Sequence, residues 1–106
     1  MLVLMVDDLP DTKPGYVDIE PHLVATTVDA AIHHLWTKPI THLYLDNDLA
    51  DPRGVEGINI LQWLLCDDLI PPNVKPTTRN PPALQRMIDV LRLDRQYRLD
   101  SGWWRK

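Results

Sequence analysis

Four short apolar segments, each bounded by polar residues or prolines, predict the strands of this chain. Leu2 to Val6 is continuously apolar, which is typical of a strand covered on both faces in a parallel sheet. Segments 22–26 and 41–45 are predicted as the second and third strands. Segment 74–78 is predicted as the fourth, and because Pro76 cannot donate a ladder hydrogen bond, we expect this strand at an edge of the sheet.

Three further segments have the apolar spacing of amphipathic helices. Thr26 or Thr27 can cap the first helix. The third begins at Asn80, because asparagine caps free backbone N–H groups and the two prolines that follow suit the first helical turn. The predicted buried faces consist of Val28, Ala31, Ile32 and Leu35 in the first helix, Ile58, Leu61 and Leu65 in the second, and Leu84, Met87, Ile88 and Leu91 in the third.

The order of these segments predicts a single α/β domain. Strands that alternate with helices favour a small three-layer arrangement around a mostly parallel sheet of four or five strands. Prolines and the Pro14-Gly15 pair interrupt residues 9–21, so we expect a loop rather than a helix between the first two strands. The domain is expected to cover residues 1–100, and residues 101–106 are expected to form a C-terminal tail or a short extra strand.

The charge of the chain is unevenly distributed. Residues 1–78 contain 12 acidic and 4 basic residues, whereas residues 79–106 contain 3 acidic and 7 basic residues, so the two parts carry −8 and +4. The overall charge of −4 argues against general nucleic-acid binding. No apolar run reaches the roughly 18 residues of a membrane span, and the chain starts directly with a predicted strand. We therefore expect a cytoplasmic protein with no membrane partner.

Acidic residues directly follow two of the predicted strands. Asp7 and Asp8 follow the first, and Asp46 and Asp48 follow the third. In open α/β sheets, ligands bind outside the carboxyl ends of the strands. Mg²⁺ prefers oxygen ligands and commonly takes one or two carboxylates together with phosphate oxygens of a substrate. We therefore predict a site for Mg²⁺ or Mn²⁺ at Asp7, Asp8 and Asp46, with the side chain or carbonyl of Asp48 as a further ligand.

Polar residues also lie between the fourth strand and the third helix. The dipole and the free N–H groups at the start of a helix favour an anion. Thr77, Thr78, Arg79 and Asn80 can add donors, so they are predicted to bind a phosphate group. The alternative is that the acidic pair after the first strand and Asn80 are only turn and cap residues.

Four motifs stand at the strand ends and in the second helix, in the order Val6-Asp7-Asp8, Leu45 to Leu49, Gly57 to Leu64, and Thr77 to Pro81. Together, from Met1 to about Leu93, they resemble the cyclic-phosphate-processing receiver-like domains, which are relatives of two-component receiver domains. The resemblance implies a receiver-like, flavodoxin-like fold and processing of cyclic phosphates on nucleotides or RNA ends. It also implies that Asp46, Asp48 and Thr78 are the catalytic residues, with Asp46 in the place of the receiver phosphoacceptor.

The chain departs from this family where protons would be transferred. Asn47 stands where family members typically carry histidine, and Thr77-Thr78 stands where they carry a His-Ser pair. Histidine is an acid or base near neutral pH, whereas asparagine cannot transfer protons. Receivers also use a lysine at the end of a fifth strand, and no such strand and lysine are evident after the third helix. The sequence thus argues against aspartyl-phosphate signalling, and it leaves open whether the chain is a phosphoesterase or only binds a phosphate-bearing small molecule or nucleic-acid end.

A basic C-terminal segment indicates a second class of function. Arg92, Arg95 and Arg98 recur every three residues, and Trp103 and Trp104 follow them. Arginine and tryptophan are enriched at interface hot spots, so this segment is a candidate surface for a protein partner or for self-association. The chain would then be a non-enzymatic receiver-like adaptor or inhibitor, such as a small accessory protein encoded by a phage. Alternatively, the segment folds back and covers the sheet edge left by the fourth strand.

Overall fold

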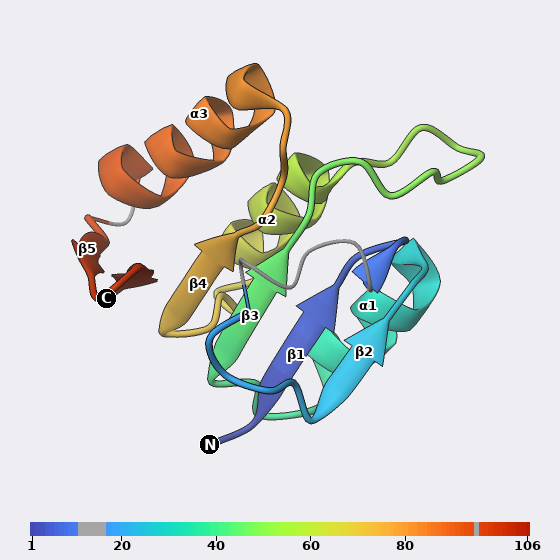
Figure 1. Cartoon of the computed structure of the whole chain (residues 1–106), viewed down its shortest axis with the longest axis horizontal. Helices are drawn as coiled ribbons and strands as arrows, with labels where there is room; N and C mark the ends of the chain where they lie inside the picture. The colour runs from blue at the N-terminus through green and yellow to red at the C-terminus, as the bar shows by residue number, and fades with distance from the viewer. Residues whose placement is uncertain (11–16, 95) are drawn as a thin grey trace.

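The computed structural model describes residues 1–10, 17–94 and 96–106, and these form an α/β domain with three α-helices and one sheet (Figure 1). Within these ranges no helix combines the length and the apolar content needed to span a membrane. The predicted Pro14-Gly15 turn lies outside the described residues. The elements are β1 (Val3–Val6), β2 (Leu23–Ala25), α1 (Val28–Thr37), β3 (His42–Leu45), α2 (Gly57–Cys66), β4 (Asn73–Pro76), α3 (Pro81–Asp89), a π-helical segment (Val90–Asp94), β5 (Arg98–Asp100) and β6 (Trp103–Arg105).

The sheet has the strand order β2-β1-β3-β4-β6-β5. The first four strands of this order are parallel, and β6 and β5 extend the sheet in antiparallel pairing. The α/β class and the mostly parallel sheet are therefore confirmed, with six strands in the described residues rather than four or five.

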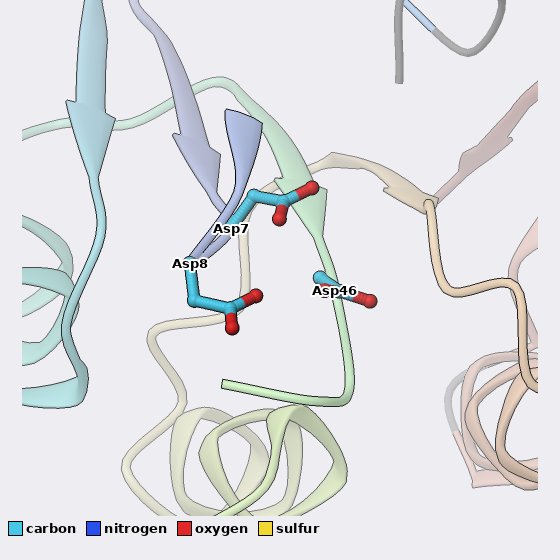
Figure 2. A group of neighbouring side chains, drawn as sticks. All are labelled: Asp7, Asp8 and Asp46. Atoms are coloured by element: carbon cyan, nitrogen blue, oxygen red, sulfur yellow. The ribbon is translucent and has the colours of Figure 1, made fainter. Parts of the chain in front are cut away.

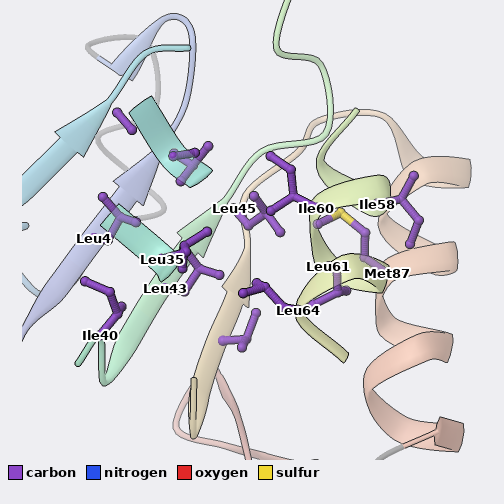
Figure 3. Packing of buried hydrophobic residues seen from close by; sticks show 14 of the residues in the cluster. Leu4, Leu35, Ile40, Leu43, Leu45, Ile58, Ile60, Leu61, Leu64 and Met87 are labelled. Atoms are coloured by element: carbon purple, nitrogen blue, oxygen red, sulfur yellow. The ribbon is translucent and has the colours of Figure 1, made fainter. Parts of the chain in front are cut away.

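The two faces of the sheet are covered in different ways. All three α-helices pack on one face, where they bury a large apolar cluster against β1, β3 and β4 (Figures 1 and 3). On the other face a smaller cluster is covered by Val17 and Ile19, which lie in the non-helical segment before β2. The large cluster includes Leu4, Leu35, Leu43, Leu45, Ile60, Leu61, Leu64 and Met87, and the small cluster consists of Val3, Met5, Tyr44 and Trp103.

The end of the chain belongs to the sheet. Strand β6 pairs with β4 at Asn73 and Val74, and β5 and β6 form a hairpin. The prediction that the Pro76 strand lies at an edge was therefore wrong. The alternative in which the C-terminal segment forms a short extra strand and folds back over the β4 edge is what the structure shows. The pairing between β4 and β6 ends before Pro76, so the missing N–H of this proline costs no ladder bond with β6.

The helices begin where the sequence predicts, but their buried faces differ in part. Ile32 in α1 and Leu65 in α2 are only half-buried, and Ile60 in α2 is fully buried. The side chain of Thr27 accepts a hydrogen bond from the Ala30 N–H, and α1 starts directly after it. In α3, Ala83 is fully buried, whereas Leu84 and Ile88 are only half-buried. The buried face of this helix therefore begins at residue 83 and continues with residues 87 and 91, whereas the predicted face began at residue 84.

Candidate functional site

Three parallel strands of the sheet end at the same level. The ladder pairs Val6 with Leu45, and Leu45 with the last residue of β4. The N–H of Asp46 donates to the carbonyl of Val6 at 3.0 Å, and the N–H of Thr77 donates to the carbonyl of Leu45 at 3.0 Å. Asp7, Asp46 and Thr77 thus continue one row across the sheet, and strand alternation directs their side chains to the same face.

The three predicted metal ligands come together at this edge. Asp7, Asp8 and Asp46 each offer a carboxylate oxygen, and these oxygens lie within 4.8 Å of one another (Figure 2). Asp7 and Asp46 are buried, with 1% and 2% of their surface exposed, and Asp8 is half-buried. Ionised carboxylates this close repel one another, and burial removes the water that would otherwise screen them. A divalent cation would offset both costs, so this donor set suits a hard ion such as Mg²⁺.

Backbone N–H groups orient two of the three carboxylates. The N–H of Leu9 donates to Oδ1 of Asp7 at 2.9 Å, and the N–H of Asn47 donates to Oδ1 of Asp46 at 2.9 Å. Because each donor comes from the turn that follows its strand, the turns fix the carboxylates before any ligand arrives. Such preorganisation lowers the ordering cost of ion binding.

Two predicted site residues lie apart from this group. Asp48 is exposed and is not one of the three converging carboxylates. Arg79 is also exposed, at the turn between β4 and α3. The structure thus gathers the predicted metal ligands but not Asp48, whose assignment as a catalytic residue stays a prediction.

Asn47 anchors the end of β3 to the start of α2. Its side-chain Oδ1 accepts the N–H of Ile58 at 3.1 Å, and its Nδ2 donates to Oε2 of Glu56 at 2.6 Å. Its carbonyl accepts the N–H of Gly57 at 2.9 Å. The residue is completely buried, and its side chain binds an N–H group in the first turn of α2. The sequence identifies Asn47 only as a residue that cannot transfer protons, because its hydrogen-bond partners lie nine to eleven residues away.

Gly57 allows α2 to approach this strand end closely. A Cβ atom at position 57 would lie 2.0 Å from the carbonyl oxygen of Asp46 and 2.9 Å from the Cα of Asn47. Both neighbours are backbone atoms, so a side chain at this position would force the helix away from the carboxylates. Gly57 begins the sequence motif of the second helix, but the backbone contact that requires glycine depends on how α2 packs against β3.

Thr77 is the buried residue at the end of β4. Its side chain is 0% exposed, and its hydroxyl oxygen has no hydrogen-bond partner in the described part of the chain. Thr78 is also buried, and its hydroxyl accepts the N–H of Asn80 at 3.2 Å. The structure therefore holds one threonine hydroxyl in a local turn and leaves the other buried without a hydrogen-bond partner among the described residues.

The start of α3 differs from the predicted phosphate cradle. Pro81 and Pro82 have no N–H group. The N–H of Ala83 donates to the side chain of Asn80 at 3.3 Å, and the N–H of Leu84 donates to its carbonyl at 2.9 Å. The expectation of free backbone N–H groups at this helix start was therefore wrong. Any phosphate here would have to use side chains or the turn before the helix.

A polar network lies on the same sheet face, further from the strand ends. The hydroxyl of Tyr44 donates to Asp18 at 2.7 Å and accepts the N–H of Ile19 at 2.8 Å. Burial raises the pKa of Tyr44 to about 12. Burial also raises the pKa of Asp18, but hydrogen bonds from Tyr44 and Trp103 and the charge of Lys75 outweigh it, so this pKa lies below its ordinary value. The network ties the segment that returns from the acidic pair to the sheet.

A mostly parallel sheet with acidic residues after its first and third strands defines a receiver-like α/β domain. The chain belongs to the family of cyclic-phosphate processing receiver domains, whose family model matches residues 2–93. This confirms the family indicated by the sequence motifs. No curated protein and no solved structure matches the chain.

Proposed function

We propose that this domain binds Mg²⁺ or Mn²⁺ through Asp7, Asp8 and Asp46, binds a phosphate group beside the ion, and processes cyclic phosphates on nucleotides or RNA ends. The observation that carries the proposal is the convergence of three carboxylate oxygens within 4.8 Å at the ends of two neighbouring strands. Membership of a cyclic-phosphate processing family supports the choice of substrate class.

The residues around the ion would have separate tasks. When bound, the ion would polarise a phosphoryl oxygen. The Thr77 hydroxyl, which continues the row of Asp7 and Asp46, would donate a hydrogen bond to the phosphate. Thr78 and Arg79 would line the phosphate from the turn before α3.

Proton transfer would fall to a residue other than the family histidine. Asn47 is committed to the cap of α2, and His42 begins β3 at the end of the strand opposite the acidic residues. Asp48, which is exposed and follows Asp46 by two residues, would take part in proton transfer, because the other three carboxylates would hold the ion.

Metal binding is tested by titrating Mn²⁺ into the wild type and Asp46→Asn, with free Mn²⁺ followed by electron paramagnetic resonance. We expect the affinity to fall at least about tenfold in the variant, because even the loss of a group that only orients a ligand typically costs 10–100-fold. Glu20→Gln makes the same charge change at an exposed residue outside the group and should bind like the wild type. Equal binding by Asp46→Asn and the wild type would remove Asp46 from the site.

Turnover is tested with 2′,3′-cyclic nucleotides and ADP-ribose cyclic phosphate in the presence of Mn²⁺. Hydrolysis by the wild type that disappears in Asp46→Asn would support an enzyme. Metal binding without turnover of any of these compounds would favour the alternative, a non-enzymatic receiver-like adaptor or inhibitor that keeps the acidic site.

A further inference from the structure

Strand β5 forms one edge of the described sheet, and all of its residues are exposed. It pairs with β6 on one side, and no described strand pairs with its other side. Its three residues, Arg98, Leu99 and Asp100, are all exposed, and Leu99 has 61% of its surface accessible. An exposed edge with an apolar residue at its centre is a template for pairing with another strand.

The hairpin determines which backbone groups this edge presents. Ser101 and Gly102 both have positive φ, 53° and 84°, as in a two-residue type I′ turn. Asp100 pairs with Trp103 next to the turn, so these two residues exchange both hydrogen bonds. Because the pattern alternates along an antiparallel ladder, the N–H and carbonyl of Leu99 point away from β6, toward the open edge.

The side chains of this edge are complementary to their own copy. We propose that β5 pairs antiparallel with β5 of a second copy of this chain, about a two-fold axis at Leu99. In this register Leu99 exchanges two backbone hydrogen bonds with Leu99 of the second copy. Arg98 then faces Asp100 of the second copy, and Asp100 faces its Arg98, so the contact places two opposite charge pairs on one face of a continuous sheet.

The surrounding contacts leave these charges available. The side chain of Arg98 has no hydrogen bond or ion pair with any described residue. The Asp100 carboxylate accepts the Ser101 hydroxyl at 3.2 Å and lies 3.6 Å from Nε of Arg105, and its side chain still has 70% of its surface exposed. The opposite sheet edge, β2, consists of Leu23, Val24 and Ala25 and carries no charge, so it has no such pattern. Charge complementarity thus favours β5 of a second copy as the occupant of this edge.

A three-residue contact is small, so the association should be weak. We expect a dissociation constant between roughly 10 µM and 1 mM, at the weak end of specific protein contacts. Sedimentation velocity of the wild type over this concentration range should show a reversible monomer–dimer equilibrium. A protein that remains monomeric up to about 1 mM would overturn the proposal.

Charge reversal tests the register. In the Arg98→Glu dimer, both symmetric pairs would consist of two acidic side chains. In the Asp100→Arg dimer, both pairs would consist of two basic side chains. Each variant alone should therefore dimerise at least about tenfold more weakly than the wild type. When the two variants are mixed, each pair again has opposite charges, and a heterodimer of near wild-type affinity should form. Circular dichroism of each variant establishes that it is folded. Failure of the two folded variants to associate on mixing would overturn the proposal.

A control at the opposite edge separates the two sheet edges. Val24 lies at the centre of β2 and is 48% exposed, and it thus occupies the same place in its edge strand as Leu99 does in β5. Leu99→Lys should abolish dimerisation, because it places two ammonium groups at the two-fold axis, and Val24→Lys should leave it unchanged. Loss of the dimer in Val24→Lys but not in Leu99→Lys would assign the contact to β2 and overturn the proposal.

Discussion

The hydroxyl of Thr77 has the environment expected of a group that forms a hydrogen bond with a ligand. It is fully buried and has no hydrogen-bond partner among the described residues, although it lies in the row of the acidic strand ends. A buried polar group without a partner costs about 1–3 kcal/mol. A ligand that accepts a hydrogen bond from this hydroxyl would recover that free energy.

Replacement of Thr77 by valine should therefore separate stability from binding. We expect Thr77→Val to leave the free energy of unfolding unchanged or to raise it by up to about 1 kcal/mol, while phosphate affinity in the presence of Mn²⁺ falls. Urea unfolding and calorimetric titration of inorganic phosphate measure the two effects. Thr41→Val is the matched control, because the Thr41 hydroxyl accepts the Leu2 N–H at 2.9 Å and its loss should destabilise the fold. A destabilised Thr77→Val with unchanged phosphate affinity would contradict the ligand role.

At the scale of elements, the site depends on how closely the start of α2 packs against the end of β3. Asn47 joins the two by side-chain and backbone hydrogen bonds, and Gly57 leaves no space for a Cβ beside the Asp46 carbonyl. The same contact that starts the helix thus sets the position of a predicted metal ligand.

Gly57→Ala should disturb both the packing and the site. The added methyl group overlaps backbone atoms, so we expect a loss of about 1–3 kcal/mol in the free energy of unfolding and a lower Mn²⁺ affinity. Gly54→Ala is the matched control, because Gly54 has a φ of 80° but no atom within 4 Å of an added Cβ. That control should lose stability through backbone strain alone and keep its Mn²⁺ affinity. Unchanged metal binding in Gly57→Ala would show that the helix contact does not position Asp46.

For the whole molecule, two histidines couple stability to pH. Burial, together with the charges of Arg105 and the amino terminus, lowers the pKa of His42 below its ordinary value, while Asp18 acts in the opposite direction. Burial and the charges of Lys38 and His33 lower the pKa of His34 as well. The unfolded chain therefore takes up protons at a higher pH than the folded chain does.

The free energy of unfolding should consequently fall as the pH is lowered from 7.5 to 5.5. The contribution of the two histidines is fully present above their ordinary pKa near 6.5 and is lost as the pH falls through the lower, folded-state values. Urea unfolding at several pH values, with EDTA present to exclude metal effects, measures this slope. His34→Gln and His42→Gln should each reduce it. A wild-type stability that rises over this interval would contradict the assignment.

The sequence by itself determined the order of the main elements and the composition of the acidic group. Apolar periodicity and capping residues are local signals, so the three helices and the four parallel strands could be predicted within a few residues of their observed bounds. Parallel strands end at one edge, so acids that follow the first and third strands could be expected to meet there. The family could be inferred because its motifs are the segments at the strand ends and in the second helix.

Tertiary structure alone decided the features that depend on distant partners. Strands of three residues have no recognisable period, so the sequence left open whether the C-terminal segment covers the sheet edge or faces a partner. The pairing of β6 with β4 and the burial of Trp103 decided between these possibilities. The cap formed by Asn47 and the contact at Gly57 depend on how α2 docks against β3, which no local pattern specifies. The local sequence also predicted a phosphate site at the start of α3. The two prolines have no N–H, and the next two N–H groups donate to Asn80, so none is free there. Backbone groups form hydrogen bonds with partners that the folded chain brings close.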